Sequence, residues 1–149
     1  MITALNIVTI ICIGLLIGTE FSVSVFINPV LYRLDEGARA RAISMFAKRL
    51  GTAMPFWYVA SLLLLIVEAI VHRHERYDML FIIASAIWAV VIVLSIVFLV
   101  PINNRMTQLG SDKFPDNAQR EHQKWERLHR IRVVALIVAM VCCLVAIGM

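Results

Sequence analysis

The chain lacks the short motifs that mark the common soluble enzymes. It contains no G-x-S-x-G, no H-E-x-x-H, no C-x-x-C and no glycine-rich phosphate loop. These absences argue against a standard hydrolase, kinase or dehydrogenase. Cysteine is also scarce, and Cys12, Cys142 and Cys143 fall inside apolar runs, where a free cysteine usually acts as a small hydrophobic residue.

Basic residues are missing from the start of the chain, and long apolar runs dominate the rest. Hydrophobic residues make up 61% of the sequence and the mean hydropathy is +0.86, which exceeds what one soluble core needs. No Lys or Arg precedes Arg33, and the first run is about twice as long as the apolar core of a signal peptide, so we expect it to stay in the mature protein. A bilayer crossing takes about 20 apolar residues. Four runs are long enough: 4–32, 53–72, 79–100 and 131–148.

These runs predict an all-α fold, an integral membrane four-helix bundle that forms a single domain over residues 1–149. The connection between the first two runs has the pattern of a short amphipathic interfacial helix, because its apolar residues share one side. Those residues are Ala42, Ile43, Met45, Phe46 and Leu50. We expect the second span to open at Met54-Pro55, followed by Trp57 and Tyr58 as interfacial aromatics. The third connection has a turn-rich centre, GSDKFPDN.

The 14 Lys and Arg residues are distributed unequally among the connections. All but Arg73 and Arg76 lie in the first and third connections or at their borders, and neither terminus carries a basic side chain. The positive-inside rule therefore predicts that these two connections are cytoplasmic and that both termini are periplasmic, in what we expect to be a bacterial inner membrane. The basic residues are interleaved with acidic ones, so we expect membrane lipid and not nucleic acid as a partner, with a homo-oligomer left open.

Polar residues converge where three spans meet at the cytoplasmic end. Asn28-Pro29 is expected to end the first span and Pro101 to end or bend the third, which brings Asn103 and Asn104 to the start of the fourth. Amides, aromatics and charges around the mouth of a bundle are typical of a small-ligand site. At about 100° per residue, five such residues share one face of the fourth helix: His122, Trp125, Glu126, His129 and Arg132. The alternative is a juxtamembrane helix whose Trp lies in the interface and whose Arg and His reach the headgroups.

Glu20 is the most informative residue of the first span. A carboxylate well inside an apolar segment costs roughly 2.5 to 3.5 kcal/mol on insertion scales, so we expect it to face the bundle and to bind substrate together with Asn28 and Asn104. It lies about 12 Å deeper than Asn28 in a continuous helix, which suits the floor of a pocket. The alternative is a protonated carboxyl group bonded to nearby backbone. Glu68 lies near the outer end of the second span, where we expect water to reach it.

Metal ligands are few. Glu126 and His129 form one E-x-x-H pair, whereas di-metal carboxylate bundles use two such pairs and two further Glu. We therefore assign no metal site, with Glu126, His129 and His122 as the remaining candidate ligands. On the outer loop His72, His74 and Glu75 have no helical register to hold a metal, and we expect them to be solvated. The sequence requires no cofactor, although metal or haem stays open.

Three segments together resemble a known family. They are GLLIGTEFSVSVFINP in the first span, VPINNRM at the end of the third, and WERLHRIR, or W-x-x-x-H-x-x-R, at the start of the fourth. This pattern is similar to that of the small four-helix membrane proteins of the anthrone-oxygenase-like family, long catalogued as a domain of unknown function. Within the first segment, Gly14, Gly18 and Ser22 form a small-residue stripe that we expect to let a neighbouring helix approach.

The resemblance implies an oxygenase-like activity, since members associated with polyketide pathways oxidise an anthrone to an anthraquinone with O₂ and no clearly established cofactor. It also implies Asn103, Trp125, His129 and Arg132 as the active residues. The chemistry is compatible, because His129 could act as a base on a carbon acid while Asn103 or Arg132 stabilises the oxyanion. Two alternatives stay open: a non-catalytic membrane subunit or small-molecule or lipid-binding protein, and a metal- or haem-binding membrane protein.

Overall fold

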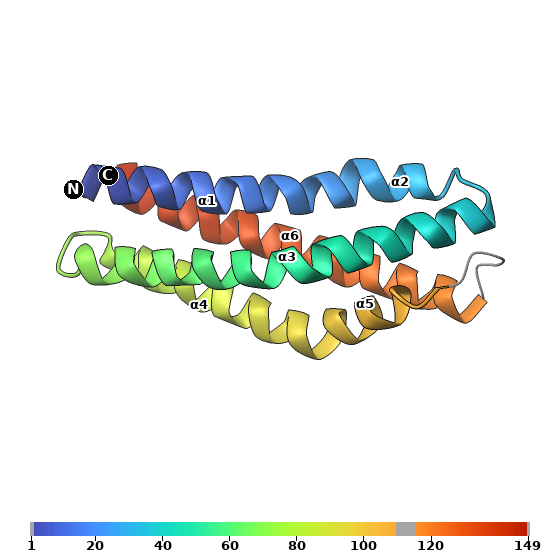
Figure 1. The fold of residues 1–149 in the computed structure, drawn as a ribbon. Helices are drawn as coiled ribbons and strands as arrows, with labels where there is room; N and C mark the ends of the chain where they lie inside the picture. Colours follow the sequence, from blue (N-terminus) through green and yellow to red (C-terminus); the bar gives the residue numbers. More distant parts are fainter. Residues whose placement is uncertain (1, 110–115, 149) are drawn as a thin grey trace.

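The computed structural model describes residues 2–109 and 116–148, and this part of the chain is helical with no strand. Long helices lie side by side, and both termini are at the same end of the bundle (Figure 1). Four helical spans are long and apolar enough to cross a membrane: Ile2–Leu31, Glu36–Val71, Asp78–Met106 and Asn117–Gly148. The predicted all-α four-helix membrane bundle is thereby confirmed. Most of the turn-rich segment GSDKFPDN lies outside the described residues.

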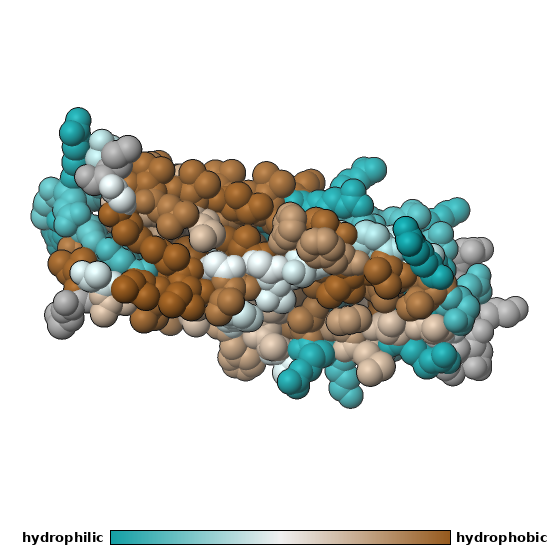
Figure 2. Space-filling model, turned by 90° about the horizontal axis from the view of Figure 1, so that it is seen from above, coloured by the Kyte–Doolittle hydropathy of each residue, from teal (hydrophilic) through white to brown (hydrophobic). Residues whose placement is uncertain are grey.

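The outside of the bundle is apolar along most of its length. In the most apolar window of each span, no more than 28% of the residues are buried inside the protein. Hydrophobic side chains cover the middle of the face seen in Figure 2, and hydrophilic ones gather at its two ends. An apolar belt bounded by two polar ends is what lipid covers. Each span also has more than the about 20 residues that a membrane crossing takes.

The first span is not a uniform α-helix. It consists of α1 (Ile2–Ser22), a π-helical turn η1 (Val23–Ile27) and α2 (Asn28–Leu31). The Asn28 N–H donates to the Val23 carbonyl, five residues earlier, in place of the usual four. This wider turn accommodates Pro29, because proline lacks an N–H and its ring collides with the carbonyl four residues before it. The helix continues to Leu31, so the expected end at Asn28-Pro29 is wrong.

The third span repeats this arrangement. It consists of α4 (Asp78–Leu94), η2 (Ser95–Leu99) and α5 (Val100–Met106), and the Val100 N–H donates to the Ser95 carbonyl. Pro101 follows η2 at the same spacing as Pro29 follows η1. Each wide turn therefore relieves the clash between a proline ring and the preceding helical turn. Pro101 does not end the third span, which reaches Met106.

The second span, α3 (Glu36–Val71), is one helix of 36 residues. Its N-cap is Asp35, whose side chain accepts from the Ala38 N–H at 2.9 Å, and the helix runs through Pro55. The expected separate interfacial helix and the expected opening at Met54-Pro55 are therefore corrected. The reason is packing: one face of the first turns of α3 lies in a core cluster inside the bundle and not flat on a membrane. That cluster comprises Leu31, Ala40, Ile43, Ala47, Ile102, Met106 and Ala118.

The fourth span, α6 (Asp116–Gly148), packs most extensively against α4. Trp88 from α4 and Leu136 from α6 are among the fully buried side chains of the main core. The small-residue stripe of α1 explains little of this packing. A Cβ on Gly14 would make an ordinary contact with Met140, and one on Gly18 would meet nothing within 4 Å, so Gly18 does not bring a helix close.

Candidate functional site

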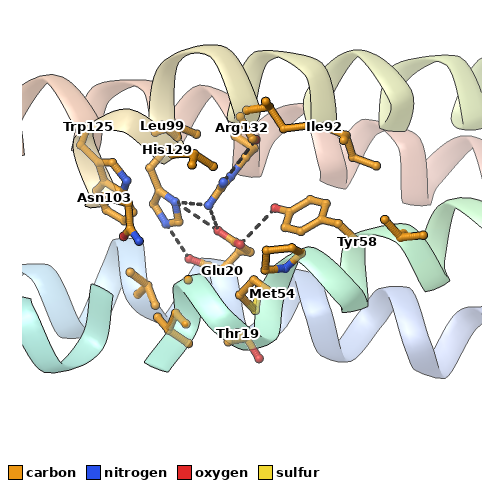
Figure 3. Close-up of a pocket in the computed structure, with 18 residues that line it drawn as sticks. Thr19, Glu20, Met54, Tyr58, Ile92, Leu99, Asn103, Trp125, His129 and Arg132 are labelled. Atoms are coloured by element: carbon orange, nitrogen blue, oxygen red, sulfur yellow. Dashed lines mark hydrogen bonds and ion pairs between the residues drawn. The ribbon is translucent and has the colours of Figure 1, made fainter. Parts of the chain in front are cut away.

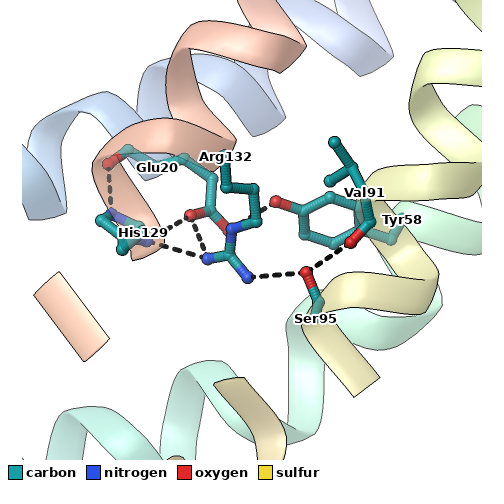
Figure 4. A network of polar contacts seen from close by, with 6 residues as sticks. All are labelled: Glu20, Tyr58, Val91, Ser95, His129 and Arg132. Atoms are coloured by element: carbon teal, nitrogen blue, oxygen red, sulfur yellow. Dashed lines mark hydrogen bonds and ion pairs between the residues drawn. The ribbon is translucent and has the colours of Figure 1, made fainter. Parts of the chain in front are cut away.

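Four polar side chains from three spans meet inside the bundle around Glu20 (Figure 4). Glu20 on α1 is only 3% exposed. Arg132 Nη2 on α6 donates to Glu20 Oε2 at 2.5 Å, and the Tyr58 hydroxyl on α3 donates to Oε1 at 3.0 Å. Both carboxylate oxygens thus have donors, which offsets the cost of burying the charge. Glu20 faces the interior as predicted, but its partners are Arg132 and Tyr58 and not the backbone.

His129 completes this cluster, and its contacts define which ring nitrogen carries the proton. Its Nε2 lies 3.1 Å from the Glu20 backbone oxygen, which can only accept, so Nε2 is the protonated nitrogen. Its Nδ1 lies 2.9 Å from Arg132 Nη2 and 3.1 Å from Glu20 Oε2. In the neutral ring Nδ1 therefore accepts from Arg132. A proton gained at Nδ1 would lie next to a carboxylate oxygen.

The π-helical turns border the cluster. Arg132 Nη1 donates to Ser95 Oγ at 3.3 Å, and Ser95, the first residue of η2, donates to the Val91 carbonyl at 2.7 Å. Glu20 lies three residues before η1 begins. The Arg132 guanidinium also lies 5.4 Å from the centre of the Tyr58 ring, a cation–π distance. The two proline-linked turns thus lie where the charged residues are held, and π turns of this kind are frequent at functional sites.

Trp125 and Asn103 extend the site toward the basic end of the bundle. The Trp125 ring stacks on His129, with centroids 4.6 Å apart and an angle of 11° between the planes. Asn103 Nδ2 donates to the Ala47 carbonyl on α3 at 3.0 Å. A Cβ at Gly51 would lie only 2.6 Å from that nitrogen, so glycine is needed there for the amide to reach α3.

A cavity of about 180 Å³ adjoins this cluster (Figure 3). Most of its wall is apolar, and the polar residues that line it include Glu20, Tyr58, Asn103, Trp125, His129 and Arg132. Part of its rim is formed by exposed side chains of α3 and of η2 and α5, namely Pro55, Val59, Ile96 and Val100. These rim residues belong to spans, so the rim lies on the surface that lipid covers. A mostly apolar cavity with a few converging polar groups is the usual form of a small-molecule site.

A second polar group lies beyond Trp125, toward the turn that joins α2 and α3. The Tyr32 hydroxyl donates to Glu126 Oε2 at 3.0 Å, and Arg130 Nη2 pairs with Glu126 Oε1 at 2.6 Å. Burial, and secondly the hydrogen bond to the Glu126 carboxylate, raise the pKa of Tyr32 to about 12. Tyr32 therefore remains a donor throughout the physiological range of pH.

The two remaining predicted substrate-binding residues differ in position. Asn28 is 2% exposed and lines a second, smaller cavity. Asn104 is exposed, lines none of the cavities described, and its carbonyl accepts from Thr107 Oγ1. Consecutive residues of a helix point about 100° apart, so Asn103 and Asn104 cannot both face inward. The prediction that Asn104 lines the site is therefore corrected.

The candidate metal ligands do not form a cluster. Within residues 2–109 and 116–148, no three His, Cys, Asp or Glu side chains lie close enough together to hold a metal ion. Glu126 is engaged by Tyr32 and Arg130, whereas His129 is engaged by Glu20 and Arg132. His122 stacks on Trp125, with centroids 6.0 Å apart. The E-x-x-H pair is thus divided between two separate polar groups.

Sequence reasoning missed several residues. Tyr58, which its position predicts to be an interfacial aromatic, is buried against Glu20, and no motif in the sequence marks Ser95 or Gly51. The spacing of polar residues in α3 could have indicated that Tyr58 is buried. Tyr58 and Ser61 are about one turn apart and lie on the same, buried face of the helix. At the outer end His74 and Glu75 are exposed as expected, but the expectation was wrong for Glu68 and His72. Glu68 is 0% exposed, and His72 is buried beside it with Nδ1 3.3 Å from Glu68 Oε2.

Together the fold and the site define a helical membrane protein with a charged cluster beside a ligand-sized cavity in its bundle. The family model for anthrone oxygenase matches residues 42–142, more than half of the chain, so the chain belongs to the anthrone oxygenase family. It is therefore an oxygenase-like membrane protein, as the sequence motifs predicted. Comparisons with curated proteins and with solved structures gave no match.

Proposed function

We propose that this protein oxidises an anthrone-like aromatic carbon acid with O₂ in the cavity beside Glu20. One observation carries the proposal: an acid–base cluster of Glu20, His129 and Arg132 faces a cavity whose other walls are mostly apolar. An apolar cavity suits a hydrophobic aromatic substrate, and a few polar groups suffice to fix its orientation. Membership of the anthrone oxygenase family supports the same chemistry.

The first step is removal of a proton from the substrate methylene carbon. His129 Nδ1 is the acceptor, since Nε2 is committed to the Glu20 backbone oxygen. Glu20 Oε2, at 3.1 Å from Nδ1, stabilises the imidazolium that forms. In the next step Arg132 shifts its donor from Nδ1 to the oxygen anion that O₂ forms at the reacting carbon.

O₂ is the oxidant in the following steps. The carbanion forms a C–O bond with O₂, which gives a peroxide anion beside Arg132, and the proton on His129 converts it to the hydroperoxide. Loss of the second proton from the same carbon breaks the O–O bond and yields the carbonyl and hydroxide, which leaves as water. One methylene group and one O₂ thus give one carbonyl group and one H₂O.

Trp125 and Asn103 orient the substrate in this scheme. The indole of Trp125 stacks on His129 and lines the cavity, so it offers an apolar edge to a flat ring. The Asn103 amide lines the same cavity. Its Nδ2 is bound to the Ala47 carbonyl, so the group that Asn103 can offer to a substrate is the acceptor Oδ1. An uncharged amide suits a partly dry site, because it brings no counter-ion.

We further propose that the substrate reaches the cavity from the membrane. The exposed rim residues Val59 and Ile96 lie on the apolar surface of the spans. The cavity lies in the half of the bundle nearer the basic connections, which the positive-inside rule puts on the cytoplasmic side, with both termini periplasmic. A reporter that is active only in the cytoplasm should give a signal when fused after Lys113 and none after Met149, and the reverse would contradict this orientation. Assembly into a homo-oligomer stays a prediction, and the cluster around Glu20 is formed within one chain.

One observation favours a second candidate function, the binding of a small lipid-soluble molecule without chemistry. Glu20, Arg132 and His129 satisfy one another's polar atoms, so the cavity could hold a ligand without using them as acid and base. A carrier of this kind would bind anthrone and consume no O₂. Turnover therefore separates the two functions.

The experiment is O₂ uptake by the detergent-purified full chain with anthrone as substrate. The proposal predicts that O₂ is consumed together with formation of anthraquinone, and that Glu20→Gln and His129→Gln lower the rate by about 100-fold or more. Glu20→Gln keeps the size of the side chain and its place beside Tyr58. Wild-type rates in both variants would overturn the assignment of the base.

A further inference from the structure

A second cavity, of about 60 Å³, adjoins the first. The two cavities share four lining residues, which form the partition between them: Val23, Leu50, Asn103 and Trp125. Asn28 and His122 line only the second cavity. A volume of this size is equivalent to about two water molecules, or to the oxygen-bearing edge of a larger ligand.

Two residues that line the second cavity each have a buried side-chain nitrogen without a partner. Asn28 is 2% exposed and His122 is 5% exposed. Neither Asn28 Nδ2 nor His122 Nε2 has a hydrogen-bond partner among the described residues. Leaving such a group unpaired is costly, and here two residues that carry one line the same small and otherwise largely apolar cavity. An amide nitrogen can only donate, so the atom that fits beside Asn28 is an acceptor.

The volume of the first cavity is smaller than a whole fused three-ring molecule occupies. Its volume of about 180 Å³ is close to that of an apolar cavity of about 150 Å³ that accepts benzene. A three-ring substrate whose reacting carbon lies at His129 therefore extends beyond this volume, with its outer rings on either side and its carbonyl oxygen pointing away from His129. The ring of Trp125 lines both cavities and offers a flat surface along which such a molecule can continue.

The spacing of the polar groups fits a substrate that reaches across the partition. Glu20 and Asn28 are eight residues apart, or about 12 Å along a helix, and His129 and His122 are about 10 Å apart by the same measure. In anthrone the acidic methylene and the carbonyl are at opposite positions of the central ring. With contacts of about 3 Å at each end, such a molecule spans roughly 10 Å between protein atoms.

We propose that the second cavity is the binding subsite for the substrate carbonyl oxygen, with Asn28 Nδ2 as one donor and His122, in the tautomer protonated at Nε2, as the other. This inference rests on the proposed function for the identity of the substrate. When the proton leaves the methylene carbon, the negative charge moves through the ring to this oxygen. Asn28 and His122 would then stabilise an oxyanion that Arg132, held beside His129 at the opposite end, does not reach.

The test compares two three-ring probes under nitrogen, where no turnover occurs. Anthrone carries the carbonyl, and 9,10-dihydroanthracene has a methylene group in its place. Binding of each to the detergent-purified full chain is measured by quenching of tryptophan fluorescence, for wild type, Asn28→Leu, His122→Phe and Asn104→Leu. The last variant is the matched control, because Asn104 is an exposed amide on the neighbouring surface. Thermal unfolding checks that each variant is folded.

The proposal predicts that wild type binds anthrone more tightly than 9,10-dihydroanthracene. Asn28→Leu and His122→Phe should each weaken anthrone binding by about tenfold, as expected for one lost hydrogen bond, and change dihydroanthracene binding by less than about twofold. Asn104→Leu should change neither. Absence of a preference in wild type, unchanged anthrone binding in both variants, or equal weakening of both probes would overturn the subsite.

O₂ uptake with anthrone, measured on the same samples, separates this inference from the proposed function. If wild type turns anthrone over while both variants bind it normally, the subsite is wrong and the function stands. If wild type prefers anthrone and the variants lose that preference, yet no O₂ is consumed, the subsite stands and the function is wrong. Failure of wild type to bind either probe would contradict both.

Discussion

Each half of the bundle buries a glutamate beside a histidine, but the two pairs are built differently. Glu20 and His129 come from different spans, Arg132 and Tyr58 join them, and all four side chains line a cavity. Glu68 and His72 are four residues apart on α3, and the histidine stacks on Phe81 with centroids 4.9 Å apart. Neither residue of this second pair lines a described cavity.

The comparison shows that burial of a charge does not by itself indicate a functional site. An i, i+4 pair on one helix forms without precise packing between helices, and near the C-terminus it can stabilise the end of that helix. His72 follows α3 directly, and its Nδ1 lies 3.1 Å from the Glu68 backbone oxygen. A cluster that spans three helices forms only when all of them pack in one register. The proposed chemistry therefore involves Glu20, and we propose a structural role for Glu68.

The largest expected effect follows from removing the cation at the Glu20 cluster. Arg132→Leu leaves the Glu20 carboxylate buried without its charged partner, which should lower the free energy of unfolding by about 3 kcal/mol or more. Removing both charges in Glu20→Leu/Arg132→Leu should recover much of that loss. Thermal or denaturant unfolding in detergent measures both variants. A double variant no more stable than Arg132→Leu would show that the pair is not held as described.

The next effect concerns the position of Asn103. Gly51→Ala places a Cβ 2.6 Å from Asn103 Nδ2, so the amide must leave the Ala47 carbonyl, and we expect anthrone oxidation to fall by about tenfold. Gly18→Ala is the matched control, since nothing lies within 4 Å of its Cβ, and alanine there should leave activity unchanged. Equal activities in the two variants would remove Asn103 from the site.

Glu68→Gln is expected to have a smaller effect than either. Glutamine has nearly the shape of the Glu68 side chain, which is 0% exposed. Residue 68 lines none of the described cavities. Anthrone oxidation should remain within about twofold of wild type, in contrast to the loss of about 100-fold expected for Glu20→Gln. A large loss of activity in Glu68→Gln would mean that the outer half takes part in the reaction.

The smallest effect is expected at Tyr32. Because its pKa is raised to about 12 from a usual value near 10, its hydrogen bond to Glu126 stabilises the fold fully below pH 10 and is lost as the pH rises toward 12. Ultraviolet titration should show one tyrosine that ionises near pH 12 in wild type and is absent in Tyr32→Phe. The variant should lose less than about 1 kcal/mol of stability at neutral pH. A normal titration of Tyr32 would argue against its contact with Glu126.

Local pattern in the sequence predicted much of this architecture. Hydropathy identified four spans, because each must be apolar over its own length whatever it packs against. Helical spacing identified the inner face of α6, where His122, Glu126 and His129 are buried. The cost of a carboxylate in lipid predicted that Glu20 faces inward.

What the sequence did not predict depends on how the helices pack against one another. Tyr58 is of a residue type that is common at membrane interfaces. Only the packing of α3 against α1, which places the two residues at the same depth in the bundle, shows that Tyr58 contacts Glu20. Pro29 is expected from the sequence to end the first span and Pro101 to end or bend the third, but the wide turns that let both helices continue could not be inferred from residue type. For the same reason, the start of α3 was assigned to the membrane surface when its apolar face in fact packs inside the bundle.

The most direct test of the central claim is the rate of O₂ uptake with anthrone by wild type and by Glu20→Gln, measured side by side with Glu68→Gln. The two variants remove one buried carboxylate each, from opposite halves of the same bundle. If the reaction takes place at the cavity beside Glu20, wild type and Glu68→Gln consume O₂ at similar rates and Glu20→Gln is slower by about 100-fold or more. The claim is contradicted if wild type consumes no O₂ with anthrone, or if Glu20→Gln is as active as Glu68→Gln.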